Sequence, residues 1–248
     1  MKKAMLLLIC NLILYSCTSK KDVKNSNVQV SVIVDETDQL KVLPETSALF
    51  NLYNFDFEEN IAATFRIRSL TDKQLNPVRE FHLPDGAETE KSNQKEDPYY
   101  REKVIQSFYT NIKHAVMQVD SDAMKDSSLQ YSECFRTLAE ELQRFQKDNQ
   151  WKSVLVVFSD LQENSDFFTC YSKANQIQLC KKPDSIVTLF NNTGLLPKNL
   201  KGVEVFFIYK PISRQDDQRF AVMASIFKKL LVDRGCDVKI QANSDFLN

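Results

Sequence analysis

Two carboxylates and two hydroxyls directly follow long apolar runs, and these side-chain types could hold a hard metal ion. The run VQVSVIV leads into Asp35, with Thr37 two residues further on. The run SVLVVF leads into Ser159 and Asp160. Carboxylate and hydroxyl oxygens are the ligands that Mg²⁺ prefers in proteins. Such a site forms only if the fold brings these two distant segments together.

Both runs predict buried strands of a parallel sheet. Each is a continuous stretch of mostly branched apolar residues, which is typical of a strand that is covered on both faces. In an open parallel sheet, ligands bind outside the carboxyl ends of the strands, where the strand order reverses. We therefore expect Asp35 and Asp160 at that edge, on neighbouring strands. The alternative is that each acid only caps the N-terminus of the following helix.

The rest of the chain predicts one α/β domain over residues 28–243, because strand patterns alternate with helix patterns. We expect a doubly wound, mostly parallel sheet, as in Rossmann-like folds. Its edge is an antiparallel hairpin of residues 61–67 and 78–83, where flanking prolines are tolerated. Two further strands are expected at 203–209 and 236–241, and helices at 44–53, 99–119, from 135 to near 149, at 185–190 and at 216–233.

The composition argues against several classes of function. Lys and Arg total 32 against 33 for Asp and Glu, so no basic excess points to nucleic acid. None of the four glycines lies in a phosphate-binding loop pattern, which argues against a kinase, an ATPase or a dehydrogenase. His82 and His114 are isolated in the sequence, so neither is expected to form a nucleophile–base pair.

The N-terminus predicts an exported protein with a lipid anchor. Lys2 and Lys3 precede an apolar run that ends at Leu14, which is too short to span a bilayer and is typical of a signal peptide. The Leu-Tyr-Ser-Cys that follows resembles the bacterial lipobox, which implies a signal peptide of residues 1–16 and acylation of Cys17. The alternative is an ordinary signal peptide with an incidental cysteine.

If Cys17 is acylated, lipid holds the mature chain on a membrane of the bacterial cell envelope without a transmembrane helix. Residues 17–27 are polar and predict a short tether. Thr18, in place of Asp, follows the cysteine, and the lipoprotein resemblance then implies sorting to the outer membrane. Whether the domain faces the periplasm or the exterior is left open by these residues.

Four cysteines lie in the predicted domain, and no pair of them has the C-x-x-C spacing of zinc or redox sites. Export permits disulfides, and Cys170 and Cys180 are close enough in sequence to close a small loop. Buried free thiols are the expectation for Cys134 and Cys236, which fall on a predicted helix and a predicted strand.

The order of elements resembles the von Willebrand factor A domain, over residues 28–243. In that family a metal-ion-dependent adhesion site combines an Asp-x-Ser-x-Ser loop after the first strand with an Asp that ends the fourth strand. Here the first loop reads Asp-Glu-Thr-Asp-Gln, so Asp35 and Thr37 match in kind and Gln39 replaces the last Ser. The amide oxygen of Gln39 can still reach a cation, and Asp38 adds a nearby charge.

The family site also uses a Thr from a loop before a later helix. Ser127 or Ser128 is the counterpart by position, where either would cap the helix that follows. Asp160 matches the acid at the end of the fourth strand, and Ser159 adds a hydroxyl beside it. The resemblance therefore implies a modified Mg²⁺ site with these residues around it.

The resemblance implies an adaptor without catalysis, which binds a protein partner at the carboxyl edge of the sheet. A bound Mg²⁺ would be completed by an acidic residue of that partner. The alternative is a metal-dependent phosphoester hydrolase of the cell envelope, in which Asp35 and Asp160 hold a metal that activates water. No histidine is expected beside the two aspartates, and no set of basic residues for a phosphate lies near them in the sequence. Both observations argue against the hydrolase.

Overall fold

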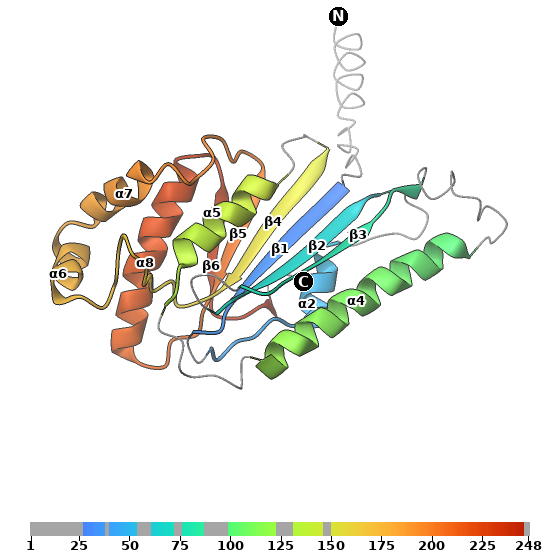
Figure 1. Cartoon of the computed structure of the whole chain (residues 1–248), viewed down its shortest axis with the longest axis horizontal. Coiled ribbons are helices and arrows are strands. Elements are labelled where there is room, and N and C mark those ends of the chain that lie inside the picture. The colour runs from blue at the N-terminus through green and yellow to red at the C-terminus, as the bar shows by residue number, and fades with distance from the viewer. Residues whose placement is uncertain are drawn as a thin grey trace, which may run out of the picture.

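Six strands form one sheet, and its two central strands are the apolar runs that lead to Asp35 and Ser159 (Figure 1). The computed structural model describes residues 27–37, 40–53, 61–71, 76–86, 99–122, 131–145 and 150–245. The predicted signal peptide and most of the tether, including Cys17, lie outside these residues. So do Asp38 and Gln39, and also Ser127 and Ser128.

The strand order is β3-β2-β1-β4-β5-β6. All pairings are parallel except that of β2 with β3, which is antiparallel at one edge. This confirms the predicted doubly wound, mostly parallel α/β sheet with an antiparallel edge strand. The strands are β1 (Asn27–Asp35), β2 (Ala63–Leu70), β3 (Val78–Leu83), β4 (Trp151–Phe158), β5 (Val203–Ile208) and β6 (Asp237–Gln241).

Helices cover both faces of the sheet because alternate side chains of the central strands point to opposite faces. Val30, Val32 and Val34 of β1 pack with α2 and α4, whereas Ile33 packs with α5 and α8. In Figure 1, α5 crosses the sheet beside α7 and α8, and α2 lies behind it. The helices are α2 (Thr46–Asn51), α4 (Tyr100–Asp122), α5 (Cys134–Arg144), α6 (Lys173–Lys181), α7 (Pro183–Asn192) and α8 (Arg214–Val232).

The core on the α5 face is rich in phenylalanine. Phe135 of α5 contacts Phe190 of α7 and Phe227 of α8, with ring centroids 4.7 and 6.1 Å apart. Phe167 and Phe168 of the loop before α6 also pack edge-on against Phe190. Aromatic rings bury large areas and edge-to-face pairs add to that burial energy. The long segment after β4 is therefore fixed to the domain by its own side chains.

The segment between β4 and β5 differs from the prediction in two respects. It contains a second helix, α6, of which only Leu179 is buried, so its sequence has little amphipathic pattern. Cys170 and Cys180 are both free thiols, so the disulfide that their spacing allows is not formed. No helix among the described residues combines the length and the apolar character that crossing a bilayer needs.

A buried ion cluster joins α5 to the sheet. The carboxylate of Glu141, which is 1% exposed, accepts bonds from Arg66 Nε at 2.9 and 3.1 Å and from Arg68 Nη1 at 3.3 Å. The hydroxyl of Ser31 in β1 donates to the same carboxylate at 2.8 Å. Each arginine side chain is 13% exposed. Glu141 is therefore the shared buried partner of two largely buried guanidinium groups.

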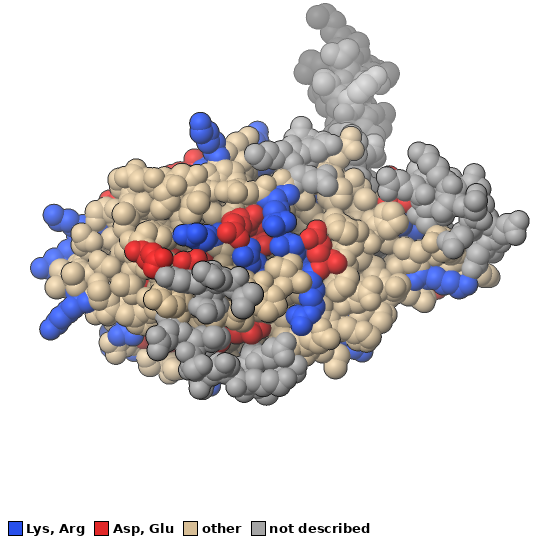
Figure 2. Space-filling view, in the orientation of Figure 1, with Lys and Arg blue, Asp and Glu red and all other residues tan. Residues whose placement is uncertain are grey.

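The outer side of this cluster reaches the surface. Arg66 also pairs with Glu80 at 2.5 Å, and Arg68 pairs with Glu140 at 2.7 Å. Figure 2 shows acidic and basic side chains interspersed across the middle of this face. Both arginines of β2 are paired with carboxylates of the domain, although Arg68 Nε has no hydrogen-bond partner among the described residues.

Candidate functional site

The two acidic segments meet at the carboxyl edge of the sheet, as predicted. In the register of β1 with β4, Val34 lies opposite Phe158, so Asp35 and Ser159 follow at the same level. After β1 the chain continues to β2, its neighbour on one side, and after β4 it continues to β5, on the opposite side of this pair. The strand order reverses here, and a doubly wound sheet has its usual binding crevice at such a point.

Hydroxyl groups surround the carboxylate of Asp35, which is 1% exposed. Its Oδ1 accepts bonds from the backbone N–H and the hydroxyl of Thr37, at 3.1 and 2.5 Å. Its Oδ2 accepts bonds from the hydroxyls of Ser159, at 2.7 Å, and Ser132, at 3.2 Å. Burial raises the pKa of Asp35, and these hydrogen bonds act in the opposite direction.

Ser132 supplies a third segment of the site. Ser127 and Ser128, which the sequence analysis expects there, lie outside the described residues. Two backbone bonds with Asn164, of 3.2 and 2.9 Å, hold the residues before α5 against the loop after β4. The expected helix cap at Ser127 or Ser128 is wrong, because α5 begins at Cys134, after Glu133. Ser132 lies in the same inter-helix connection, only a few residues further along.

Neither Asp35 nor Asp160 caps a helix, so that alternative is wrong for both. The first helix after Asp35 begins only at Thr46, and α6 is capped by Ser172. Instead, each carboxylate closes a tight turn by accepting the backbone N–H two residues on. For Asp160 that donor is Gln162, at 2.8 Å. Asp160 is 8% exposed, so the turn lies almost entirely within the protein.

The turn after β4 contains a backbone conformation that is unusual for its residue. Leu161 has a φ of 60°, in the left-handed region that a bulky L-residue rarely adopts. Its N–H donates to Ser159 Oγ at 2.8 Å, and its side chain is fully buried in the α5-face core. These two contacts hold the conformation, which fixes the direction in which Ser159 and Asp160 project.

Glu163 is a third buried acid beside the site, and the sequence patterns did not single it out. Its Oε2 accepts the N–H of Phe135, at 2.8 Å, and so caps the first turn of α5 from another segment. No described residue donates to its Oε1 within hydrogen-bonding distance. The Ser165 hydroxyl nearby donates to the Phe168 carbonyl oxygen, at 3.2 Å. Burial raises the pKa of Glu163 to about 8.

The thiol of Cys134 lies close to all three of these acids. Burial raises the pKa of its thiol, and the charges of Asp35, Glu163 and Asp160 raise it further. Its Sγ lies 3.9 Å from Ser159 Oγ. The thiol therefore stays protonated at neutral pH and serves as a small packing group between the acids, not as a nucleophile.

The donor set suits a hard cation. Asp35, Thr37, Ser132, Ser159 and Asp160 offer only oxygen, which favours Mg²⁺ over zinc or copper. Among the described residues, no three side chains of the His, Cys, Asp and Glu types are grouped as metal ligands. A cation at this edge would therefore be held by one or two carboxylates and several hydroxyl oxygens.

His82 lies away from this site. His82 pairs with Thr64 in the register of β2 with β3, whereas Leu70 of β2 lies opposite Asp35. Six residues of strand separate these two levels, which is about 20 Å. His82 therefore cannot act as a proton-transfer group at the carboxyl edge. His114 is exposed on α4.

No known protein family and no curated protein matches this chain. Among solved structures, it is similar to an aerotolerance-related membrane protein from Bacteroides fragilis NCTC 9343, with 10% identity and a TM-score of 0.38. That match covers 87% of this chain and 92% of the other. It is also similar to the conserved hypothetical protein BatB from Bacteroides thetaiotaomicron, with 8% identity and a TM-score of 0.38 over 89% and 94% of the two chains. At these values we infer neither a family nor a function from the similarities.

Proposed function

We propose that this chain is a non-catalytic binding protein of the bacterial cell envelope, with a domain that resembles the von Willebrand factor A domain. It binds a protein partner at the carboxyl edge of the sheet, through the site around Asp35 and Asp160. A Mg²⁺ ion bound there would supply a positive centre for an acidic residue of the partner. The chain itself positions the oxygen ligands.

One observation carries this proposal. Asp35 accepts hydrogen bonds from Ser132 and Ser159, which follow it in the sequence by about a hundred residues or more. These segments meet at the edge of the sheet where the strand order reverses. A buried carboxylate is costly to place without compensation, and here three hydroxyls are arranged around it. Such an arrangement at the usual binding edge of the fold supports a ligand site.

Binding is favoured over phosphoester hydrolysis by what surrounds the site. Hydrolysis needs a group that moves protons and cations that neutralise the phosphate. His82 lies elsewhere, and the two arginines of β2, Arg66 and Arg68, are engaged by Glu141. The carboxylates and hydroxyls around Asp35 can hold and orient a cation, and that is sufficient for recognition of an acidic partner.

The partner and Mg²⁺ can be tested with one substitution. We expect that the full chain, used as bait in solubilised envelopes of the source bacterium, retains a defined protein in Mg²⁺ and releases it in EDTA. Asp35→Asn should lose that protein, because the amide removes the charge that attracts the cation. Asp217→Asn, at an exposed acid in the first turn of α8, should retain it.

Thermal melts show whether Mg²⁺ itself binds. At ten times its Kd, a ligand specific for the folded state adds about 1.4 kcal/mol, or roughly 3–6 °C for a domain of this size. Wild type and Asp217→Asn should show this rise, and Asp35→Asn should not. If Asp35→Asn retains the protein as well as wild type does, the site is not the binding surface. Retention in EDTA with no rise in Tm would remove Mg²⁺ from the proposal.

The lipid anchor gives a separate prediction. In a bacterial host grown with radiolabelled palmitate, the full chain should become labelled and should sediment with membranes. Cys17→Ser should abolish the labelling completely, because the acylated sulfur is gone. Cys10→Ser, within the apolar run of the signal peptide, is the matched control and should be labelled like wild type. Equal labelling of both variants would contradict acylation at Cys17.

A further inference from the structure

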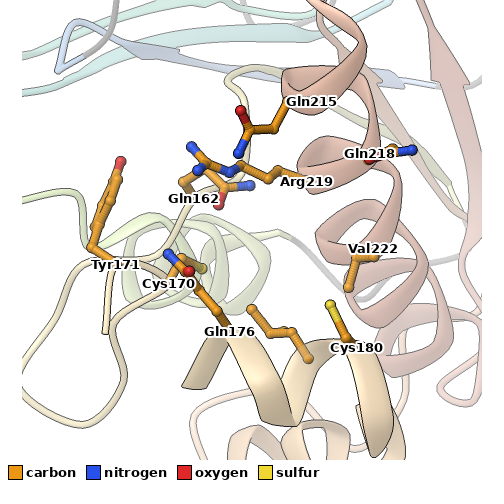
Figure 3. Close-up of a pocket in the computed structure, with 10 residues that line it drawn as sticks. Gln162, Cys170, Tyr171, Gln176, Cys180, Gln215, Gln218, Arg219 and Val222 are labelled. Carbon is orange, nitrogen blue, oxygen red and sulfur yellow. The ribbon is translucent and has the colours of Figure 1, made fainter. Parts of the chain in front are cut away.

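A pocket of about 380 Å³ opens beside the candidate site. Its walls come from the turn after β4, from α6 and from the first turns of α8 (Figure 3). Gln162 lies in its wall, two residues after Asp160, so the pocket adjoins the carboxyl edge. A volume of this size holds a single amino-acid residue or another small ligand with most of its surface buried.

One end of the pocket is polar and carries a positive charge. In Figure 3, the side chains of Arg219, Gln162 and Gln215 are directed toward the same end. Arg219 forms no ion pair with any described carboxylate, and no acid lines the pocket. A guanidinium in this position presents a planar fork of donors that matches a carboxylate. The pocket therefore has an unneutralised site for an anion.

The other end is apolar. Leu179 of α6 and Val222 of α8 line it, and Figure 3 shows Cys180 facing Val222 there. Gln176 and Gln218 also line the pocket, and each side-chain amide offers both donors and an acceptor. Amides of this kind can satisfy the N–H and C=O of a peptide bond. The lining thus combines a cation, peptide-like partners and an apolar floor.

These features match one residue type better than others. An acidic side chain would use Arg219 and leave the apolar end empty, and an internal apolar residue would leave Arg219 without an anion. A C-terminal apolar residue carries a carboxylate, a peptide bond and an apolar side chain within one residue. We propose that the pocket binds the C-terminal residue of a partner chain, with its carboxylate on Arg219 and its side chain against Leu179 and Val222.

This inference goes beyond the proposed function and needs neither Asp35 nor Mg²⁺. The test uses fluorescence anisotropy of the full chain with a fluorescein-labelled Gly-Ser-Gly-Ala-Leu peptide that has a free carboxyl terminus. We expect saturable binding of this acid, and binding weaker by on the order of tenfold or more for its C-terminal amide. A third probe, Gly-Asp-Gly-Ala-Leu amide, has only an internal acid and should bind as weakly as the amide.

Two variants make the result specific. Arg219→Gln should weaken binding of the acid to the level of the amide, and Gln218→Glu should also weaken it, by repulsion within the pocket. Arg214→Gln makes the same change at an exposed arginine of α8 outside the pocket and should bind like wild type. Both pocket substitutions are at exposed residues, so their thermal melts should match that of wild type.

The proposal is overturned if acid and amide bind equally, if Arg219→Gln binds like wild type, or if no saturable binding occurs. Equal binding of the internal-acid peptide would also overturn it, because the pocket would then recognise acidic side chains. Asp35→Asn should bind the acid peptide like wild type. The Asp35→Asn variant distinguishes the pocket from the candidate metal site, because the proposal for one can be contradicted while the proposal for the other holds.

Discussion

Alanine in place of Glu141 is expected to lower the free energy of unfolding by about 3–5 kcal/mol. The carboxylate of Glu141 is the shared partner of Arg66 and Arg68, which are both largely buried between β2 and α5. Its removal leaves the two arginines with only their more exposed partners, Glu80 and Glu140. The loss of the buried carboxylate from two largely buried guanidinium groups costs more than the net worth of one ion pair. Urea unfolding of the full chain, followed by circular dichroism, measures the loss.

Glu140→Ala is the matched control for this experiment. Glu140 is the preceding residue of α5 and pairs with Arg68 at 2.7 Å, but its side chain is 44% exposed. An exposed pair contributes at most about 1 kcal/mol, so this variant should unfold almost like wild type. Similar losses for the two variants would mean that burial does not govern the cluster, and the account given for Glu141 would be wrong.

Glutamine in place of Glu163 is expected to stabilise the protein at pH 8.5 and to have little effect at pH 5. The pKa of Glu163 is raised from 4.5 to about 8, so the folded state holds a proton that the unfolded state has lost between these values. Stability from this group is therefore present below about pH 4.5 and is lost as the pH rises to 8. The shift corresponds to at most about 5 kcal/mol.

The comparison with Glu163→Ala separates protonation from capping. Glutamine keeps an oxygen that can accept the N–H of Phe135, whereas alanine removes it and should cost about 1 kcal/mol more. Unfolding is measured in EDTA from pH 5 to 8.5, so that divalent ions do not contribute. Wild type should lose more stability with rising pH than Glu163→Gln does. Parallel pH profiles would contradict a raised pKa for this acid.

The sheet could be predicted because its central strands are mostly apolar. A run such as that from Val28 to Val34 can be buried on both faces only in the middle of a covered sheet. This pattern predicts that β1 and β4 are parallel neighbours, and that Asp35 and Ser159 therefore meet. The helix α6 could not be predicted in this way, since only Leu179 of its residues is buried.

The rest of the site depends on loops, and loop geometry is not contained in a periodic pattern. Ser132 reaches Asp35 because its backbone pairs with Asn164, a contact that no local motif indicates. Glu163 likewise accepts the N–H of Phe135 and so caps α5, a helix that precedes it in the chain. The alternation of Arg66 with Phe65 and Ile67 predicts the polar side of a strand, but not its burial. The burial of Arg66 is indicated by Glu141, an acid that lies between the apolar Leu138 and Leu142 on the buried side of α5.

The position of β1 at the centre of the sheet has a consequence for how the chain acquires its structure. Gln29 and Ser153 are hydrogen-bonded across β1 and β4, yet 124 residues separate them. A ribosome therefore completes the first strand long before its partner on that side exists, and closure of so long a loop slows folding. Until β4 has been synthesised, the apolar strand β1 stays without one of its two neighbours, in a form that chaperones can hold extended.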